Sequence, residues 1–155
     1  MPAPAISHLI GTSALIILIL VMPLFYFYVV NNINVEMMNR ELKEAADYVS
    51  NSLENLFLLA NSTNCEVVLE KKLDLPSSIR ESTYYVEIVY DLNSSAQCVK
   101  AYLKGDLGAS ADSLIVPGLK ADNKKGCVIE SGDKTVVAGC GRNCTGTYVW
   151  IREGV

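Results

Sequence analysis

The chain has 155 residues, enough for one domain with an anchoring segment and too few for a multidomain enzyme. Met1 to Val35 carries no charged residue, so all 13 Lys and Arg and all 17 Asp and Glu follow it. The net charge of -4 argues against nucleic acid as a partner, because phosphate binding needs a basic surface. The composition therefore indicates an apolar part joined to a part typical of a soluble domain.

The first part contains an apolar run, Ile6 to Val30, which we expect to form a helix. A helix of this length spans about 37 Å and crosses a bilayer core. The run is longer than the apolar region of a signal peptide, and no basic residue precedes it. Residues 1–5 are expected to form a short leader-like N-terminus. Pro23 removes a backbone hydrogen bond near Ile19, and we expect Ser13 or an adjacent helix to satisfy the carbonyl left over.

After residue 30 the helical pattern continues as an amphipathic stripe. Its apolar residues recur every three or four positions: Val35, Met38, Leu42, Ala45, Val49, Leu53, Leu56 and Ala60. We therefore predict one helix over 6–62, with a membrane or filament-core part at 6–30 and an amphipathic part at 31–62. Packing of the stripe on the protein's own head is favoured over a coiled-coil seam with another chain.

Residues 63–155 change to a period of two and are rich in β-branched and aromatic residues, which predicts a β-rich extracellular head. Residues 83–91 and 97–104 are expected to form a hairpin. In the register we predict, Val86 faces Leu103 and Tyr90 faces Val99, which places Glu87 diagonal to Lys100.

A second predicted hairpin joins 127–130 to 135–137, and 147–152 supplies a closing strand. Shorter candidates at 66–69 and 114–116 bring the total to about six or seven strands. Glycines such as Gly105 and Gly141 are expected at turns between these runs. The predicted fold class is thus α+β: a long hydrophobic-then-amphipathic N-terminal helix packed on a C-terminal antiparallel, β-sandwich-like head.

Three Asn-x-Ser/Thr acceptor patterns begin at Asn61, Asn93 and Asn143, all after the apolar run. The five cysteines also follow it: Cys65, Cys98, Cys127, Cys140 and Cys144. Glycan acceptors and disulfide candidates together indicate an oxidising exterior. The pairing that we predict is Cys65 with Cys98, plus Cys127 with either Cys140 or Cys144.

We predict no enzyme, no catalytic site, no metal and no cofactor. The only histidine, His8, lies in the apolar run, where it cannot pair with a nucleophile or a thiolate cluster of the head. Phosphate loops, zinc-protease patterns and other catalytic motifs are absent from the sequence.

The opening Ile6-Ser7-His8-Leu9-Ile10-Gly11-Thr12 is similar to the Ile-Ser-x-Ile-Ile-Gly start of archaeal type IV pilins and archaellins. The stretch Leu73 to Ile79 before Tyr84-Tyr85-Val86 also resembles the heads of archaeal pilin-like proteins. The resemblance implies insertion in the membrane, cleavage of a short leader, and assembly of identical chains through their apolar helices. The resemblance does not extend to the leader, because pilin leaders normally end in a basic residue followed by a small one, and residues 1–5 contain no basic residue. Two alternatives stay open: cleavage near Ala5 by another rule, and no cleavage.

We therefore expect a structural subunit of a type IV pilus-like surface filament used in adhesion, whose adhesion target the sequence does not identify. The expected assembly residues are Ile6, Ile10, Gly11, Leu15, Ile19, Pro23 and Phe27. The alternative is a single-pass, membrane-anchored ectodomain of the cell envelope, resembling the stator-like accessory proteins of the archaellum. A binding module is a third alternative, and it predicts an aromatic patch on the head drawn from Tyr84, Tyr85, Tyr148 or Trp150.

Overall fold

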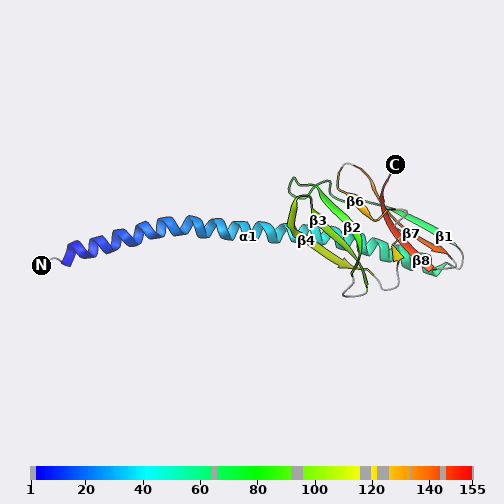
Figure 1. Cartoon of the computed structure of the whole chain (residues 1–155), viewed down its shortest axis with the longest axis horizontal. Helices are drawn as coiled ribbons and strands as arrows, with labels where there is room; N and C mark the ends of the chain where they lie inside the picture. The colour runs from blue at the N-terminus through cyan, green and yellow to red at the C-terminus, as the bar shows by residue number, and fades with distance from the viewer. Residues whose placement is uncertain are drawn as a thin grey trace. The chain divides into compact units, whose positions relative to one another are not determined.

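The structure, a computed structural model, describes residues 3–63, 66–91, 96–115, 120–121, 126–132, 134–143 and 146–154. Within them one helix is followed by strands (Figure 1): α1 (Ala3–Ser62), β1 (Val67–Leu73), β2 (Tyr84–Asp91), β3 (Ala96–Leu103), β4 (Asp106–Leu114), β5 (Lys120–Ala121), β6 (Val128–Glu130), β7 (Val136–Asn143) and β8 (Gly146–Glu153). The chain divides within α1 into two compact units, Met1–Met37 and Met38–Val155, and each is described by itself.

The long N-terminal helix expected from the sequence is confirmed, and α1 begins three residues before the predicted start. Its sequence is rich in Leu, Ile, Met and Ala, which favour helix. At its end, the backbone N–H and the side-chain hydroxyl of Thr63 both donate to the carbonyl of Ala60, at 3.4 and 2.8 Å. These contacts satisfy a carbonyl that has no partner within the helix, and they end α1 where turn-forming residues begin.

The amphipathic stripe packs on the head of the same chain, as predicted. Its members from the second unit are buried in one core with residues of both sheets: Leu42, Ala45, Val49, Leu53, Leu56 and Ala60. Met38 packs against this core, whereas Val35 in the first unit is exposed. The core therefore begins beyond the first unit of the chain.

The strands form two four-stranded sheets, in the orders β1-β7-β8-β5 and β4-β3-β2-β6. All pairs are antiparallel except that of the two-residue strand β5, which runs parallel to β8. In Figure 1, β2, β3 and β4 lie together, and β1, β7 and β8 lie together. The α+β fold class is thereby confirmed: one long helix and two largely antiparallel sheets.

The first predicted hairpin forms, but its register was wrong by two residues. Val86 pairs with Ala101, and Tyr90 pairs with Gln97. Glu87 lies directly opposite Lys100 instead of diagonal to it. Because side chains alternate with a period of two, this shift changes the cross-strand partners and leaves the same residues facing the core.

The second predicted hairpin was wrong. β6 pairs with β2, while β7 pairs with β1 and β8 in the other sheet. Ser131 holds the chain to β2 just after β6: its N–H donates to the Tyr84 carbonyl, and its hydroxyl oxygen accepts from the Tyr84 N–H, both at 2.8 Å. The residues expected to turn a hairpin therefore carry the chain from one sheet to the other.

Most of β4 was not predicted from the sequence, which indicated only a short strand at 114–116. Leu114 is the last residue of β4, and Val116 lies outside the described residues. Small side chains of β4 are buried: Ala109, Ala111 and Ser113. Gly141, expected at a turn, lies within β7 opposite Tyr148, whereas Gly105 has the positive φ (92°) of a turn glycine.

Candidate assembly segment and its attachment to the head

The apolar part of α1 exposes the large apolar side chains that the structure describes there. Its large apolar side chains from Leu9 to Tyr28 are 53 to 74% exposed. By length and composition, α1 is the one helix in the described part of the chain able to cross a membrane. Apolar area removed from water gains about 25 cal/mol per Å², so this surface favours lipid or other apolar helices over water.

Five of the predicted assembly residues follow one another in steps of four: Gly11, Leu15, Ile19, Pro23 and Phe27. Steps of four along an α-helix form a continuous ridge, the kind that packs into the groove of a second helix. A Cβ atom added at Gly11 would meet nothing within 4 Å, so this end of the ridge is open to close approach. Ile10 is also exposed, and the side chain of Ile6 lies outside those described.

Two hydroxyls in the apolar part, those of Thr12 and Ser13, are bonded within the helix. Ser13 donates to the Leu9 carbonyl at 2.8 Å, and Thr12 donates to the carbonyls of His8 and Leu9 at 3.0 Å. Ser13 therefore does not serve the carbonyl near Ile19, because a serine hydroxyl bonds to the carbonyl three or four residues before it and Ile19 lies six residues after Ser13. The other alternative, an adjacent helix, stays a prediction.

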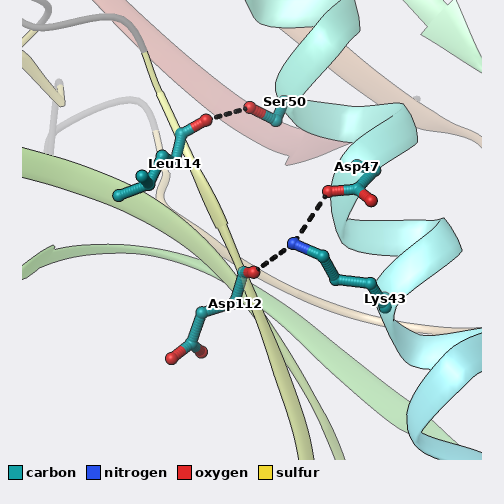
Figure 2. Close-up of polar contacts among 5 residues, drawn as sticks. All are labelled: Lys43, Asp47, Ser50, Asp112 and Leu114. Carbon is teal, nitrogen blue, oxygen red and sulfur yellow. Dashed lines mark hydrogen bonds and ion pairs between the residues drawn. The ribbon is translucent and has the colours of Figure 1, made fainter.

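A polar clamp joins the amphipathic part of α1 to β4, an edge strand of its sheet (Figure 2). The ammonium of Lys43 donates to the carbonyl of Asp112 at 2.6 Å and pairs with Asp47 at 3.1 Å, and Ser50 donates to the carbonyl of Leu114 at 2.7 Å. A side-chain hydrogen bond from Ser113, followed by the contact with Lys43, lowers the pKa of Asp47. The helix thus occupies backbone acceptors of an edge strand that would otherwise be open to strand pairing.

A second attachment is made by Arg142 of β7 at the end of α1. Its guanidinium donates to the carbonyls of Ala60, Asn61 and Thr63, at 3.4, 3.0 and 2.9 Å. A positive charge is favoured at this terminus because the carbonyls there have no helical partners and carry the negative end of the helix dipole. The attachment fixes the last turn of α1 to β7.

Two of the three residues predicted from the sequence to be glycan acceptors lie at this attachment. Asn61 is exposed in the last turn of α1, and Asn143 is exposed at the end of β7, next to Arg142. The third, Asn93, lies outside the described residues. The fold therefore brings the segments of two predicted acceptors, far apart in the sequence, to one place.

Of the cysteine pairs expected from the sequence, only Cys127 with Cys140 lies wholly within the described residues. Cys140 is buried in β7 as a thiol, and burial raises its pKa to about 11. The bond predicted between Cys127 and Cys140 is therefore not formed. Cys98 is buried in β3, and Cys65 and Cys144 lie outside the described residues.

Two of the four aromatic residues considered for a binding surface are structural. Tyr84 and Trp150 are fully buried, and the Tyr84 hydroxyl donates to the Pro76 carbonyl at 2.8 Å. Burial raises the pKa of Tyr84 to about 12. Tyr85 stacks on Tyr102, with ring centroids 5.5 Å apart. The expected patch is thus reduced to the partly exposed Tyr85 and Tyr148.

One shallow cavity of about 350 Å³ lies between the amphipathic part of α1 and the segment after β1. Its lining includes Glu41, Glu44, Tyr48, Asp74 and Pro76. Among the side chains described, these carboxylates and the remaining His, Cys, Asp and Glu form no group of three that could hold a metal ion.

Comparison with known proteins adds no relative: no family model, no curated protein and no solved structure matches this chain. Sequence reasoning missed the two attachments of α1, because Lys43, Ser50 and Arg142 carry no local pattern that distinguishes them from other polar surface residues.

Proposed function

We propose that this protein is a structural subunit of an extracellular, type IV pilus-like filament, assembled through the apolar helices of identical chains. The observation that carries the proposal is the continuity of α1. The helix carries no charged residue before Glu36, and its large apolar side chains from Leu9 to Tyr28 are exposed, whereas apolar residues from Leu42 onward are buried in the core of the head. Such a chain provides both a segment for assembly and a folded domain.

The ridge from Gly11 to Phe27 supports packing between copies. The absence of a side chain at Gly11 permits close backbone approach, which helix association in apolar surroundings depends on, because burial from water contributes nothing there. Before assembly, the same segment would be satisfied by lipid. We therefore place the protein in the membrane first and at the cell surface, within a filament, afterwards.

The head supports an outward-facing role. Its own core is complete without the apolar segment, and Asn61 and Asn143 are exposed for glycan attachment. The function proposed is mechanical and adhesive, and it requires no catalytic residue.

A second candidate is a single-pass, membrane-anchored ectodomain of the cell envelope. It is favoured by the even exposure of the apolar segment on all its faces, since a helix surrounded by lipid needs no particular face. The two candidates differ in whether the apolar helices of identical chains meet.

The test replaces Leu15 or Ile19 by Lys in the full chain within producing cells. A charge at the centre of an apolar helix costs about 2.5–3.5 kcal/mol in membrane insertion and more where helices pack closely. We expect the variants to remain in the membrane fraction and to yield no filaments in electron microscopy of sheared surface material. Val68→Lys is the matched control, because Val68 is 58% exposed on the head.

Filaments made of this chain, lost in Leu15→Lys and kept in Val68→Lys, support the filament proposal. N-terminal sequencing of the recovered chain gives its start and distinguishes processing near Ala5 from none. Filaments that persist in Leu15→Lys contradict packing through this ridge. Recovery of the unchanged chain from detergent-extracted membranes alone, without filaments, favours the anchored ectodomain.

A further inference from the structure

The predicted glycan acceptor at Asn61 depends on three residues, Asn61-Ser62-Thr63, all of which the structure describes. Asn61 and Ser62 belong to the last turn of α1, and Thr63 follows it directly. The Asn61 side chain is exposed, but exposure alone does not make an acceptor. A transferase must engage the asparagine amide and the hydroxyl two residues later together, which is why such acceptors lie in surface loops.

The conformation at the end of α1 keeps these two groups apart. Successive residues of an α-helix are rotated by about 100°, so residues two positions apart do not face each other. The Thr63 hydroxyl is also occupied: it donates to the Ala60 carbonyl at 2.8 Å, and the Thr63 N–H donates to the same carbonyl at 3.4 Å. A transferase can therefore engage this acceptor only after the end of the helix opens.

Arg142 of β7 holds the same end closed. Its guanidinium donates to the carbonyls of Asn61 and Thr63, at 3.0 and 2.9 Å, and so bridges the first and last residues of the acceptor sequence. Arg142 is itself held in the sheet, where it pairs with Val67 of β1 and with Thr147 of β8. Hydrogen bonds from a charged donor are roughly twice as strong as neutral ones, so this bridge opposes opening of the last turn.

We propose that the fold closes Asn61 as a glycan acceptor, that Arg142 keeps it closed, and that a glycan reaches Asn61 only before the end of α1 docks on β7. This order of events rests on the extracellular location in the proposed function, where the chain meets a glycan transferase. A glycan attached before docking is compatible with the folded head, because the Asn61 side chain is exposed.

The transfer uses a lipid-linked sugar phosphate as its donor. The amide nitrogen of Asn61, Nδ2, forms a bond to the anomeric carbon of the first sugar. The bond from that carbon to the phosphate oxygen breaks, and the lipid phosphate leaves with the electron pair. One amide proton passes to a base of the transferase, and no oxidant or reductant takes part. Arg142 contacts none of these atoms and acts only through the backbone of the acceptor, as a positioning residue.

The test compares Asn61 with an open acceptor in the same molecule. The full chain, purified in detergent, carries a C-terminal extension with the same Asn-Ser-Thr sequence. It is incubated with a purified single-subunit oligosaccharyltransferase and a lipid-linked sugar donor, and samples are digested with trypsin. Asn61 is the one acceptor in the peptide Glu44 to Lys71, and cleavage after Arg152 places the extension on another peptide. Mass spectrometry then gives the ratio of the two transfer rates.

We expect Asn61 of the unchanged chain to be modified at less than about one tenth of the rate of the extension, since only the opened fraction reacts. Arg142→Ala should raise the ratio roughly tenfold, the effect of losing a charged hydrogen bond. Arg142→Lys should give an intermediate ratio, because an ammonium keeps the charge without the planar fork. Arg152→Ala is the matched control, since the Arg152 guanidinium is bonded to Glu70 of β1 instead.

Hydrogen exchange of the same variants separates opening of the last turn from loss of the whole fold. Arg142→Ala should speed amide exchange at the end of α1 and leave it unchanged at Val149 and Ile151, which are buried in β8. Transfer to Asn61 as fast as to the extension in the unchanged chain overturns the closed acceptor. A slow ratio that Arg142→Ala does not raise, or a rise accompanied by faster exchange throughout the head, overturns the role of Arg142.

Chain recovered from producing cells separates this proposal from the proposed function. A glycan on Asn61 in cells, together with slow transfer to the purified chain, supports transfer before docking. Absence of glycans from Asn61, Asn93 and Asn143 in cellular material counts against an extracellular location. The ratio measured on the purified chain then still decides whether the fold closes Asn61, because the purified enzyme and donor are supplied whatever the location of the protein.

Discussion

Gly139 and Gly141 of β7 lie opposite Trp150 and Tyr148 of β8, and the two aromatic rings stack with centroids 5.6 Å apart. A Cβ atom at Gly139 would overlap the Trp150 indole, and one at Gly141 would lie 2.6 Å from the Tyr148 ring. Glycine is required at these two strand positions because an aromatic ring lies directly over each backbone, and neither glycine is at a turn. Gly141, which was expected at a turn, thus lies in a strand against the Tyr148 ring, and Gly139 lies against the neighbouring Trp150 ring.

Replacing Gly139 by Ala should therefore destabilise the head. The added methyl displaces the buried indole, and overpacking of this kind costs about 1–3 kcal/mol. Unfolding by urea is followed by the fluorescence of Trp150, the only tryptophan of the chain. Gly132→Ala is the matched control, because a Cβ at Gly132 meets nothing within 4 Å. Equal stability of the two variants would contradict the close packing of Trp150 on β7.

At the scale of elements, the sequence predicted α1 and its buried stripe because a 3.6-residue period continued over many turns leaves little choice of structure. It predicted the β2–β3 pair but missed its register, since a shift of two residues keeps Val86 on the same face. It missed β4 because Ala109 and Ala111 resemble loop residues in isolation. Their small size fits a strand buried beneath α1, and this was visible only in the fold.

The attachments of α1 to the head are made by residues that are far apart in the sequence. Arg142 meets Asn61 through the β1–β7 pairing, which periodicity cannot give. The apolar assembly segment, in contrast, could be read directly from the sequence, because its property is composition: it lacks charge over its whole length. Only the structure revealed the contacts that attach the amphipathic part of α1 to the head.

The clamp between α1 and β4 gives a test at this scale. Ser50 is buried and donates to the Leu114 carbonyl at 2.7 Å. Ser50→Ala removes the donor and leaves that carbonyl without this bond, so we expect a loss of about 1 kcal/mol in the free energy of unfolding. Ser62→Ala is the control, since the exposed Ser62 hydroxyl bonds only to its own helix, at Leu59, and its loss should change stability by less than about 0.5 kcal/mol.

Urea titrations of the two variants in the full chain measure the difference. A Ser50→Ala variant as stable as Ser62→Ala would mean that the clamp contributes nothing, and that burial of the stripe alone holds α1 on the head.

At the scale of the whole molecule, the two units of the chain should determine different properties. Every residue of the buried core lies between Leu42 and Ile151, and none comes from the first unit. Among the described residues, the apolar segment therefore contributes exposed surface and no member of this core. Solubility and assembly should depend on the first unit, and folding of the head should depend on the second.

A fragment of residues 38–155 should consequently fold without the apolar segment. We expect it to be soluble without detergent, monomeric in sedimentation, and to unfold in one cooperative transition, because it retains the stripe, the clamp and both sheets. The full chain, with large apolar side chains 53 to 74% exposed over residues 9–28, should require detergent under the same conditions. A fragment that aggregates or unfolds without cooperativity would show that the first unit supports the head, and the two parts could then no longer be assigned separate roles.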